Sequence, residues 1–517
     1  TWKDITNNSV PHDKKVKSGT LFKYLQEQNE KVFIELKTAR RRAIDPPTFN
    51  KIRDYKKQKD LFERDCFLIK SEKPTWCEMD WVADELKERS IDNFKLNFCN
   101  LLSIIKQTDK KGKVIEIPTK FCDIWVNDEN RKEFDRMDFL PPPLEANPFT
   151  YNLYTGMYID DIEDGEFENM DETERLEKLD RVLNHLYFLS GCDNKSYQYL
   201  LKVFAYKVKF PAILHKVMVV FRSVQGCGKN AFLDWFGNKI LGNTYYACSS
   251  NSDDFLGKFN TMVKGKLLVV FNEMDGKDGF AYSARLKEFA TEEQLFHEKK
   301  GIDRKKIKNC MLTCFASNNK NPVKVEIGDR RFFIVECSDR VLYIPMYFEE
   351  LFVDLEDPCV AKCFTWYCRN MVEVEEDFNF KRERPITRVY KELQNKNKSV
   401  MVKFLEWFVM DLHGDCNIKY TMTQLWVFFK QFKEDTRSRQ VWDKDGFENT
   451  IKDYIYYCKE DLLGKRDFNK VIKQSKISTY VYRFSEVRIK ALIDLYDIDK
   501  DLVFLDSDSE DEVDEDL

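Results

Sequence analysis

The chain has 517 residues, of which 43% are hydrophobic, 14% aromatic and 33% charged, and its formal net charge is −5. The length exceeds what one hydrophobic core usually organises, so we expect three or four units of ordinary domain size. No apolar run is long enough to cross a bilayer and no secretory pattern opens the chain, so we expect neither a membrane protein nor a secreted one. The first residue is Thr1 rather than Met, which leaves open that the chain is part of a longer product.

The negative charge is concentrated at the end of the chain. Residues 506–517 carry eight acids and no base, so the remainder is mildly basic. We interpret this segment as a disordered acidic tail, with a docking site for a basic partner as the alternative. The fifteen cysteines are odd in number and scattered, which favours reduced thiols inside a cell. Cys359, Cys363 and Cys368 lack the Cys-x-x-Cys spacing of zinc sites, so buried thiols are the preferred interpretation.

Residues 1–180 are predicted to form a mostly helical accessory domain. This segment is rich in Lys, Glu and aromatic residues, and its pattern predicts helices at Thr20–Arg41, Lys51–Arg64, Asp80–Lys106 and Asn130–Met137. Three consecutive prolines at 141–143 and an acidic stretch at 160–177 interrupt the periodicity. They predict a linker at about 141–175.

A core domain is predicted at 181–340. After a helical pattern from Leu176 to Val208, four short apolar runs follow, at Val217–Phe221, Leu267–Phe271, Cys310–Ala316 and Phe332–Val335. Uninterrupted apolar strands separated by helical stretches are typical of a parallel sheet covered on both faces. The sequence therefore predicts an α/β core with a parallel sheet between helices.

Two further regions are predicted behind this core. Helices at Asp357–Val372 and Lys398–Val409 indicate a helical extension of the core over 341–412. From 413 to 505, helices followed by short strands near Lys476–Phe484 indicate a small winged-helix-like domain.

The segment between the first strand and a predicted helix at Ala231–Ile240 has the composition of a phosphate-binding loop. Gly226 and Gly228 let backbone N–H groups approach phosphate oxygens, and Lys229 can reach the β- and γ-phosphates of ATP. The pattern departs from the usual one in two places. Ser223 replaces the first Gly, and Asn230 replaces the Ser or Thr that binds Mg²⁺, although an Asn oxygen can still meet the metal. The predicted nucleotide-binding residues are Ser223, Val224, Gln225, Gly226, Cys227, Gly228, Lys229 and Asn230. A simple strand-to-helix turn with an incidental lysine is the alternative.

Polar residues end the next two strands. Asn272 and Glu273 follow the second strand, where Glu273 can hold Mg²⁺ or polarise the attacking water, and Asp275 is a weaker candidate. A strand-terminal solvated acid is the alternative for Glu273. Asn318, at the end of the third strand, is placed to orient water against the γ-phosphate.

Two arginines precede the fourth strand. Either Arg330 or Arg331 can act as an arginine finger on the nucleotide of a neighbouring subunit, so that hydrolysis depends on oligomerisation. A surface salt bridge with Asp329 is the alternative.

Residues 295–308 predict a basic β-hairpin with its turn near Gly301. In a ring around DNA, Lys299, Lys300 and Lys305 would contact phosphates in a salt-dependent, largely sequence-blind manner. An exposed charged hairpin without a ligand is the alternative.

The order of these elements resembles that of the superfamily 3 helicases, AAA+ motors of DNA viruses, plasmids and phages. It resembles most closely the helicase part of poxvirus-type and phage primase-helicases. The likeness covers about residues 120–410. The matching segments are Gly226–Asn230, Asn272-Glu273, Glu298–Gly301, Ala316–Asn319 and Asp329–Phe332, flanked by Asn152–Gly156, Gly257–Asn260 and Arg384–Thr387.

The resemblance implies a P-loop AAA+ core, homohexameric rings, ATP hydrolysis with Mg²⁺ at subunit boundaries and 3′ to 5′ translocation on DNA. It also implies a collar-like N-terminal domain, single-stranded or forked DNA and a primase or polymerase as partners, and action in the host cytoplasm, a viral factory or the nucleus. We therefore expect an ATP-dependent DNA helicase of viral or mobile-element replication. An ATP-regulated DNA-binding scaffold with weak turnover and a P-loop packaging motor are the alternatives.

Overall fold

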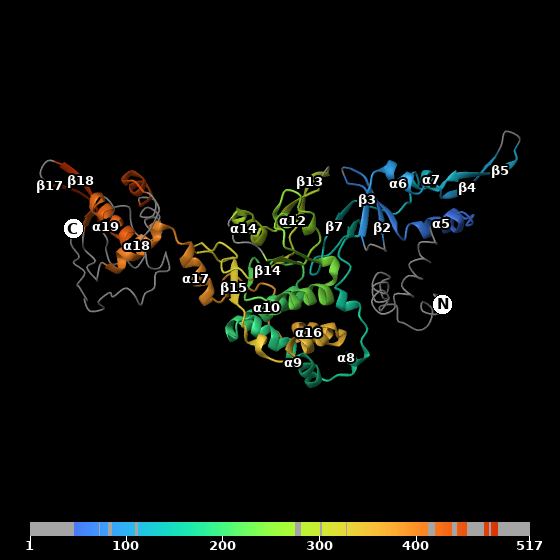
Figure 1. Cartoon of the computed structure of the whole chain (residues 1–517). Helices are drawn as coiled ribbons and strands as arrows, with labels where there is room; N and C mark the ends of the chain where they lie inside the picture. Colours follow the sequence, from blue (N-terminus) through green and yellow to red (C-terminus); the bar gives the residue numbers. More distant parts are fainter. Residues whose placement is uncertain are drawn as a thin grey trace, which may run out of the picture. The chain divides into compact units, whose positions relative to one another are not determined.

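The structure is a computed structural model, and its ribbon is shown in Figure 1. It describes residues 46–71, 73–80, 85–108, 112–273, 281–299, 302–326, 328–411, 419–436, 442–451, 470–474 and 477–483. None of the helices in this part of the chain is long and apolar enough to cross a membrane. The chain divides into two compact units, one of residues 1–323 and 331–387, the other of 324–330 and 388–517.

The first unit contains a five-stranded parallel sheet. Its strands are β9 (Met218–Arg222), β10 (Tyr246–Ser249), β11 (Leu268–Asn272), β14 (Leu312–Ser317) and β15 (Phe332–Glu336). They lie in the order β10-β11-β14-β9-β15, and every neighbouring pair is parallel. This confirms the predicted parallel sheet and its four apolar strands. The sequence pattern missed β10, an edge strand in which only Ala247 is buried.

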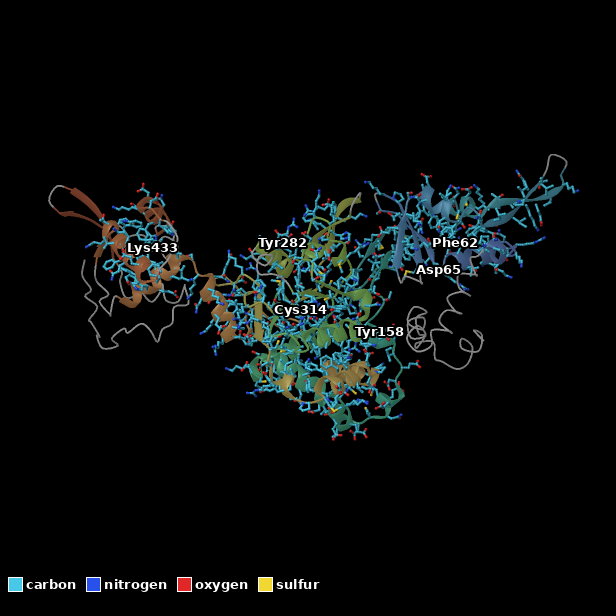
Figure 2. The ribbon with its side chains drawn as sticks, in the orientation of Figure 1. Phe62, Asp65, Tyr158, Tyr282, Cys314 and Lys433 are labelled. Carbon is cyan, nitrogen blue, oxygen red and sulfur yellow. The ribbon has the colours of Figure 1, made fainter. Side chains whose placement is uncertain are left out.

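Side chains alternate between the two faces along each strand, and other elements cover both faces of the sheet. On one face, Phe271 and Phe315 stack with ring centroids 4.7 Å apart and meet Phe255 of α12 (Asp253–Leu256) and Phe289 of α14 (Ser283–Thr291). The opposite face packs against the largest hydrophobic cluster. It includes the fully buried Cys314 in the middle of β14, labelled in Figure 2.

Three long helices supply this second layer: α9 (Glu172–Leu189), α10 (Asn194–Lys209) and α16 (Pro358–Asn370). Each begins at an aspartate whose carboxylate accepts backbone N–H groups that the first turn leaves unpaired. In α9, Asp171 and Glu174 form a reciprocal capping box. These helices confirm the helical patterns predicted at 176–208 and 357–372. The remaining helices of this layer are α11 (Lys229–Trp235), which continues as the π-helical η3 (Phe236–Gly242), and α15 (Tyr347–Glu356).

The N-terminal region is not mostly helical in its described part, so that prediction was wrong. The predicted helix at 80–106 holds the end of one strand, a second strand, a short helix and part of a third strand, and the one at 130–137 holds β6 and part of β7. The described elements are α4 (Pro46–Phe49), α5 (Tyr55–Phe62), β1 (Cys66–Ile69), β2 (Thr75–Asp80), β3 (Glu85–Arg89), α6 (Ile91–Asn97), β4 (Leu102–Thr108), β5 (Val114–Lys120), α7 (Phe121–Val126), β6 (Glu133–Phe134), β7 (Arg136–Asp138) and β8 (Thr150–Asn152). Charged residues fit solvent-facing strand positions as well as helices, and the pairing that selects strands is not visible locally. The helix at Lys51–Arg64 is confirmed in shortened form by α5, and Thr20–Arg41 lies outside the described residues.

This region has an aromatic core of its own. Phe62 contacts the rings of Phe94, Phe98, Phe121 and Trp125 at centroid distances of 5.0–6.0 Å. All five side chains are buried. The helices α5, α6 and α7 pack with β1 and β2 around this cluster. On the sheet β3-β2-β1-β6, Phe67, Ile69 and Cys77 form a second buried cluster. These elements form a small mixed α/β subdomain.

The predicted linker at 141–175 contains regular structure. It includes β8, η2 (Tyr158–Asp161), α8 (Gly165–Asn169) and the start of α9. Met157, Ile159 and Ile162 are buried in the same cluster as the central sheet. The packing of the core therefore begins well before residue 181, because these apolar residues are spaced within an acidic segment that masks them in the sequence.

The second unit contains α17 (Arg388–Asn397), α18 (Val400–Asp411), β16 (Lys419–Thr421), α19 (Met422–Asp435), β17 (Lys470–Gln474) and β18 (Ile477–Arg483). Its strands form an antiparallel sheet in the order β16-β18-β17, and β18 confirms the strand predicted near 476–484. Residues 388–411 group with this unit. They are therefore not part of a core extension at 341–412, as predicted. The acidic tail at 506–517 lies outside the described residues.

Candidate functional site

The predicted phosphate loop lies at the carboxyl end of β9 and leads into α11. Gly226 and Gly228 have φ values of 90° and 78°, in the left-handed region that favours glycine. A Cβ atom at Gly228 would lie 2.5 Å from Cε1 of His185. Both the backbone conformation and the close packing therefore require glycine at 228.

Lys229 is buried at the first position of α11. Its Nζ donates hydrogen bonds to Ser223 Oγ at 2.5 Å and to Asn318 Oδ1 at 2.7 Å. Burial lowers the pKa of Lys229, because desolvation penalises its charged form. Ser223, which replaces the expected first Gly of the loop, thus holds the lysine in place.

Glu273 follows β11 in a left-handed conformation with φ of 56°. Such a conformation costs a residue other than Gly on the order of 1–3 kcal/mol, and it persists where surrounding contacts enforce it. Here the Glu273 N–H donates to the Ala316 carbonyl at 2.8 Å. Its Oε1 accepts from Asn318 Nδ2 at 2.5 Å. The strained backbone therefore directs the carboxylate toward the end of β14.

Asn318 connects the lysine to the glutamate. The ammonium of Lys229 can only donate and an ionised carboxylate can only accept, whereas a side-chain amide does both. Oδ1 of Asn318 faces the lysine and Nδ2 faces the glutamate, which satisfies both partners. Because β14 lies between β9 and β11, its terminal amide fills the space between the two charged groups.

Asn230 lies beside this group. Its Nδ2 donates to Asn272 Oδ1 at 3.0 Å, while its own Oδ1 is buried and finds no hydrogen-bond partner among the described residues. Leaving a buried acceptor unpaired costs about 1–3 kcal/mol. Amide and carboxylate oxygens are ligands that Mg²⁺ accepts, and Asn230 and Glu273 supply one of each. Asn230 and Glu273 are thus the residues here that fit a hard cation.

His185 of α9 packs against the loop at Gly228. Its Nε2 lies 3.2 Å from the Gly228 carbonyl and its Nδ1 lies 3.0 Å from the Tyr347 hydroxyl. Because a carbonyl only accepts, Nε2 carries the proton and Nδ1 accepts from Tyr347. Burial lowers the pKa of His185 to about 4. This role of His185 is not visible in the sequence, because the residue lies far ahead of the loop on the buried face of an ordinary amphipathic helix.

The remaining residues of the predicted loop and the two arginines are placed as follows. Val224 and Gln225 are exposed and Cys227 is buried. Arg331 directly precedes β15, and its carbonyl accepts the Met218 N–H at 2.7 Å. Arg330 is exposed and falls in the segment 324–330 that groups with the second unit. The assignment of an arginine finger stays a prediction, and Asp275 lies outside the described residues.

The predicted hairpin is confirmed as β12 (Gln294–Lys299) and β13 (Ile302–Lys308), which pair antiparallel. On its surface the guanidinium of Arg304 lies 3.6 Å from the ring centroid of the exposed Phe296, and the Lys306 ammonium lies 5.6 Å from it. Lys305 is exposed on β13. Lys299 belongs to β12, its side chain is not described, and Lys300 is outside the described residues.

The loop 257–260 is hydrogen-bonded to strand β12 of this hairpin. Asn260 donates to the Phe296 carbonyl at 2.8 Å and accepts the Glu298 N–H at 3.1 Å. The neighbouring Phe259 is exposed, and the Lys258 ammonium lies 5.5 Å from its ring. The hairpin and the loop together present two exposed aromatic rings, each beside basic side chains. The sequence analysis noted this loop only as part of the family resemblance.

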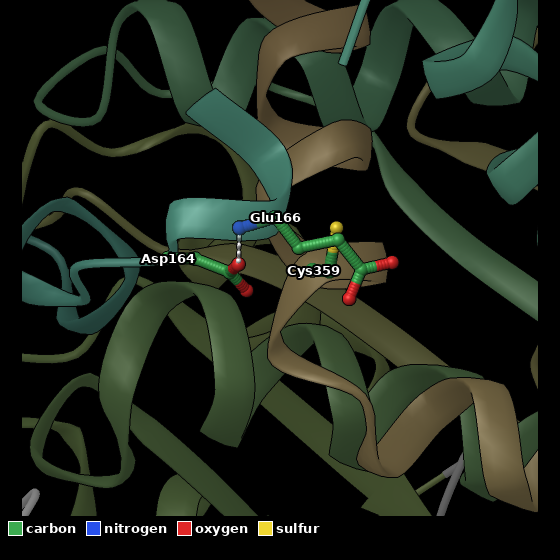
Figure 3. A group of neighbouring side chains, drawn as sticks. All are labelled: Asp164, Glu166 and Cys359. Atoms are coloured by element: carbon green, nitrogen blue, oxygen red, sulfur yellow. Dashed lines mark hydrogen bonds between the residues drawn. The ribbon is translucent and has the colours of Figure 1, made fainter. Parts of the chain in front are cut away.

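A separate group of potential metal ligands, Asp164, Glu166 and Cys359, is drawn in Figure 3, with ligand atoms within 4.8 Å of one another. Asp164 caps α8 by accepting the Glu166 N–H at 2.9 Å, and Glu166 pairs with Lys178 at 3.0 Å. Burial raises the pKa of the Cys359 thiol. A helix cap and an ion pair therefore account for this group. Cys363 and Cys368, which follow on α16, are also buried, and burial raises their pKa values.

Comparison with known proteins finds one matching family and one similar curated protein that concern this account. A family described only as a family of unknown function (DUF5906) matches residues 221–331. The chain is 29% identical over 123 residues to the DNA primase-polymerase of Nitratiruptor phage NrS-1. That match spans 23% of this chain and 17% of the phage protein.

Solved structures extend the likeness to most of the chain. An apo structure of the NrS-1 C-terminal region matches with a TM-score of 0.55 and 17% identity over 85% of this chain and 99% of that one. A second apo form of this region matches with a TM-score of 0.56 and 16% identity over 85% and 100%. The chain therefore shares the fold of this phage C-terminal region, and a stretch of 123 residues is similar in sequence to a phage primase-polymerase.

The low pKa of His185 predicts a loss of stability in acid. Since its folded-state pKa of about 4 lies below the ordinary value of 6.5, the unfolded chain takes up the proton first as the pH falls. Stability should therefore drop between pH 6.5 and pH 4, by roughly 2 kcal/mol at pH 5. Urea unfolding of the wild type and of His185→Gln at pH 7 and pH 5 measures this contribution.

Glutamine keeps a donor for Gly228 but does not titrate, so the variant should lose less stability than the wild type on acidification. His215, whose pKa is also lowered by burial, is present in both proteins and cancels in the comparison. Equal acid sensitivity of the two proteins would show that His185 does not stay neutral.

Proposed function

We propose that this chain is an ATP-hydrolysing DNA motor of viral genome replication, of the helicase type found in superfamily 3. The observation that carries the proposal is the hydrogen-bonded chain from Ser223 through Lys229 and Asn318 to Glu273. It lies where β9, β14 and β11 end side by side, next to a loop whose Gly226 and Gly228 have positive φ values. Ligands of parallel α/β sheets bind outside the carboxyl ends of the strands.

The residues divide the work of hydrolysis among them. Lys229 exchanges Ser223 and Asn318 for the β- and γ-phosphate oxygens when nucleotide binds. Glu273 takes the proton of a water molecule as the water oxygen bonds to the γ-phosphorus and the bond to the β–γ bridging oxygen breaks, leaving ADP and phosphate. Asn318, released from the lysine, keeps its Nδ2 on Glu273 and turns Oδ1 to the water.

Mg²⁺ fits the oxygen atoms of this site. Asn230 Oδ1, buried and unpaired among the described residues, and the carboxylate of Glu273 would hold the ion together with the phosphates. When bound, Mg²⁺ neutralises charge that develops on the phosphate oxygens.

The hairpin supports DNA as the second ligand. Exposed Phe296 and Phe259 offer faces on which unpaired bases can stack, while Arg304, Lys306 and Lys258 supply charge for phosphates. Lys299, Lys300 and Lys305 remain candidates for phosphate contacts on the same hairpin. In a homohexamer the hairpins would line the channel, and Arg330 or Arg331 would reach the nucleotide of the next subunit.

The comparison with known proteins supports a role in viral DNA replication. Similarity to a phage DNA primase-polymerase supports a role in viral DNA replication, on single-stranded or forked DNA and beside a primase or polymerase. One observation favours a second function, an ATP-regulated DNA-binding scaffold. The family resemblance leads us to expect a hydroxyl at position 230 and an acid at position 272. Both positions hold Asn instead, and the two side-chain amides bond to each other.

The test that separates these functions is steady-state ATP hydrolysis with and without single-stranded DNA, beside unwinding of a forked duplex. We expect DNA to stimulate turnover of the wild type. Glu273→Gln should lower turnover by about 10²–10⁴-fold because it removes the base, while ATP affinity stays within a few fold. A wild type that binds ATP but neither hydrolyses it nor opens the duplex would assign the chain to the scaffold class.

The basic residues of the hairpin are expected to contribute to binding of single-stranded DNA. The double variant Arg304→Ala/Lys306→Ala should weaken binding of single-stranded DNA and reduce the slope of log affinity against log salt by roughly 1.4, since each lost phosphate contact contributes about 0.7. Fluorescence anisotropy across a salt series measures both quantities. The matched control is Lys195→Ala/Arg382→Ala, which removes two exposed basic residues elsewhere in the same unit. If both double variants behave alike, the hairpin has no special part in binding.

A further inference from the structure

The segment that follows β15 is firmly held at both ends. The Cys337 N–H donates to the Arg222 carbonyl at 2.8 Å and the Ser338 N–H to the Phe188 carbonyl at 2.9 Å. Val341 is buried, and Tyr347 is buried again with its hydroxyl on His185. The backbone between these anchors is therefore built into the fold.

Five consecutive residues between the anchors, 342–346, are exposed. Four of them carry large apolar side chains, and their exposed fractions are 41% for Leu342, 78% for Tyr343, 42% for Ile344 and 62% for Met346. Scattered single apolar residues are ordinary at a protein surface, but a contiguous run marks a contact site. A tyrosine at its centre supplies a flat ring that stays accessible.

This run lies directly beside the phosphate loop. A Cβ atom at Gly226 would lie 3.3 Å from Cδ2 of Leu342, so the leucine packs over the backbone of the loop. Val224, on the same loop, is also exposed. The apolar surface is therefore continuous with the loop proposed to hold the phosphates.

We propose that the run Leu342–Met346 is the platform for the nucleobase, with the Tyr343 ring stacked on the base. The inference rests on the proposed function, since it places the base of a nucleotide whose phosphates lie on the loop around Gly226. A nucleotide has one charged end and one flat apolar end, and this part of the chain offers a matching polar loop and apolar run side by side.

The chemistry of the platform fixes the class of nucleotide. Aromatic and aliphatic side chains contact the face of a base and do not read the donors and acceptors along its edge. Purines present more area for stacking than pyrimidines. The platform therefore favours purine nucleotides over pyrimidine nucleotides and discriminates only weakly between adenine and guanine.

The experiment compares two probes that share the phosphates but not the base. Binding of ATP and of inorganic tripolyphosphate to the full chain, both with Mg²⁺, is measured by titration calorimetry. Tyr343→Ala should weaken ATP binding by about 10-fold and leave tripolyphosphate binding unchanged, because stacking on one base is worth about this factor. Tyr343→Phe should bind ATP as the wild type does. The control Phe149→Ala removes another exposed aromatic residue, whose exposed fraction is 64%.

Three results would overturn the platform, and they are distinguishable from one another. If Tyr343→Ala binds ATP as tightly as the wild type while both bind tripolyphosphate, the proposed function survives and the base lies elsewhere. If the substitution instead changes the oligomeric mass in sedimentation and not ATP affinity, the run is a contact between copies of the chain. If the wild type binds neither probe, the proposed function fails and the platform fails with it.

Discussion

The side-chain amide of Asn318, held between an ammonium and a carboxylate, is the contact on which the candidate site depends. Lys229 Nζ lies 2.7 Å from its Oδ1 and Glu273 Oε1 lies 2.5 Å from its Nδ2, with the lysine at the start of α11 and the glutamate directly after β11. This geometry exists only because β14 lies between β9 and β11 in a parallel sheet. In the proposed mechanism, the amide keeps the two charged groups aligned until the lysine moves to a phosphate oxygen.

Much of the surrounding packing serves to hold the loop in one conformation. Gly228 leaves no room for a Cβ atom because His185 and Phe348 press against it. The left-handed backbone of Glu273 is maintained by its N–H bond to Ala316, so the stability of the sheet offsets the local strain. Rigid support of this kind suits the proposed site, in which side chains would change partners on nucleotide binding.

The sequence predicted those parts of the fold whose signals are local. Apolar runs such as Val217–Phe221 locate the buried strands, and the glycines around Lys229 locate the loop and its lysine. The strands β2, β3 and β4 were missed because their solvent-facing residues resemble helical surface residues, and pairing selects between the two. His185 and Leu342 were missed because their closeness to the loop arises from packing between distant segments. The catalytic, metal and DNA roles of the predicted residues remain predictions.

Equilibrium ATP binding by the full chain and by Lys229→Ala tests the central claim most directly, with Lys195→Ala as the control for loss of one lysine. The arrangement of Lys229 at the loop predicts that the wild type and the control bind ATP alike, and that Lys229→Ala loses at least about 100-fold in affinity, as expected for a buried charge-assisted contact to phosphate. Wild-type affinity in Lys229→Ala would contradict the account, because the loop would then not be where the nucleotide binds.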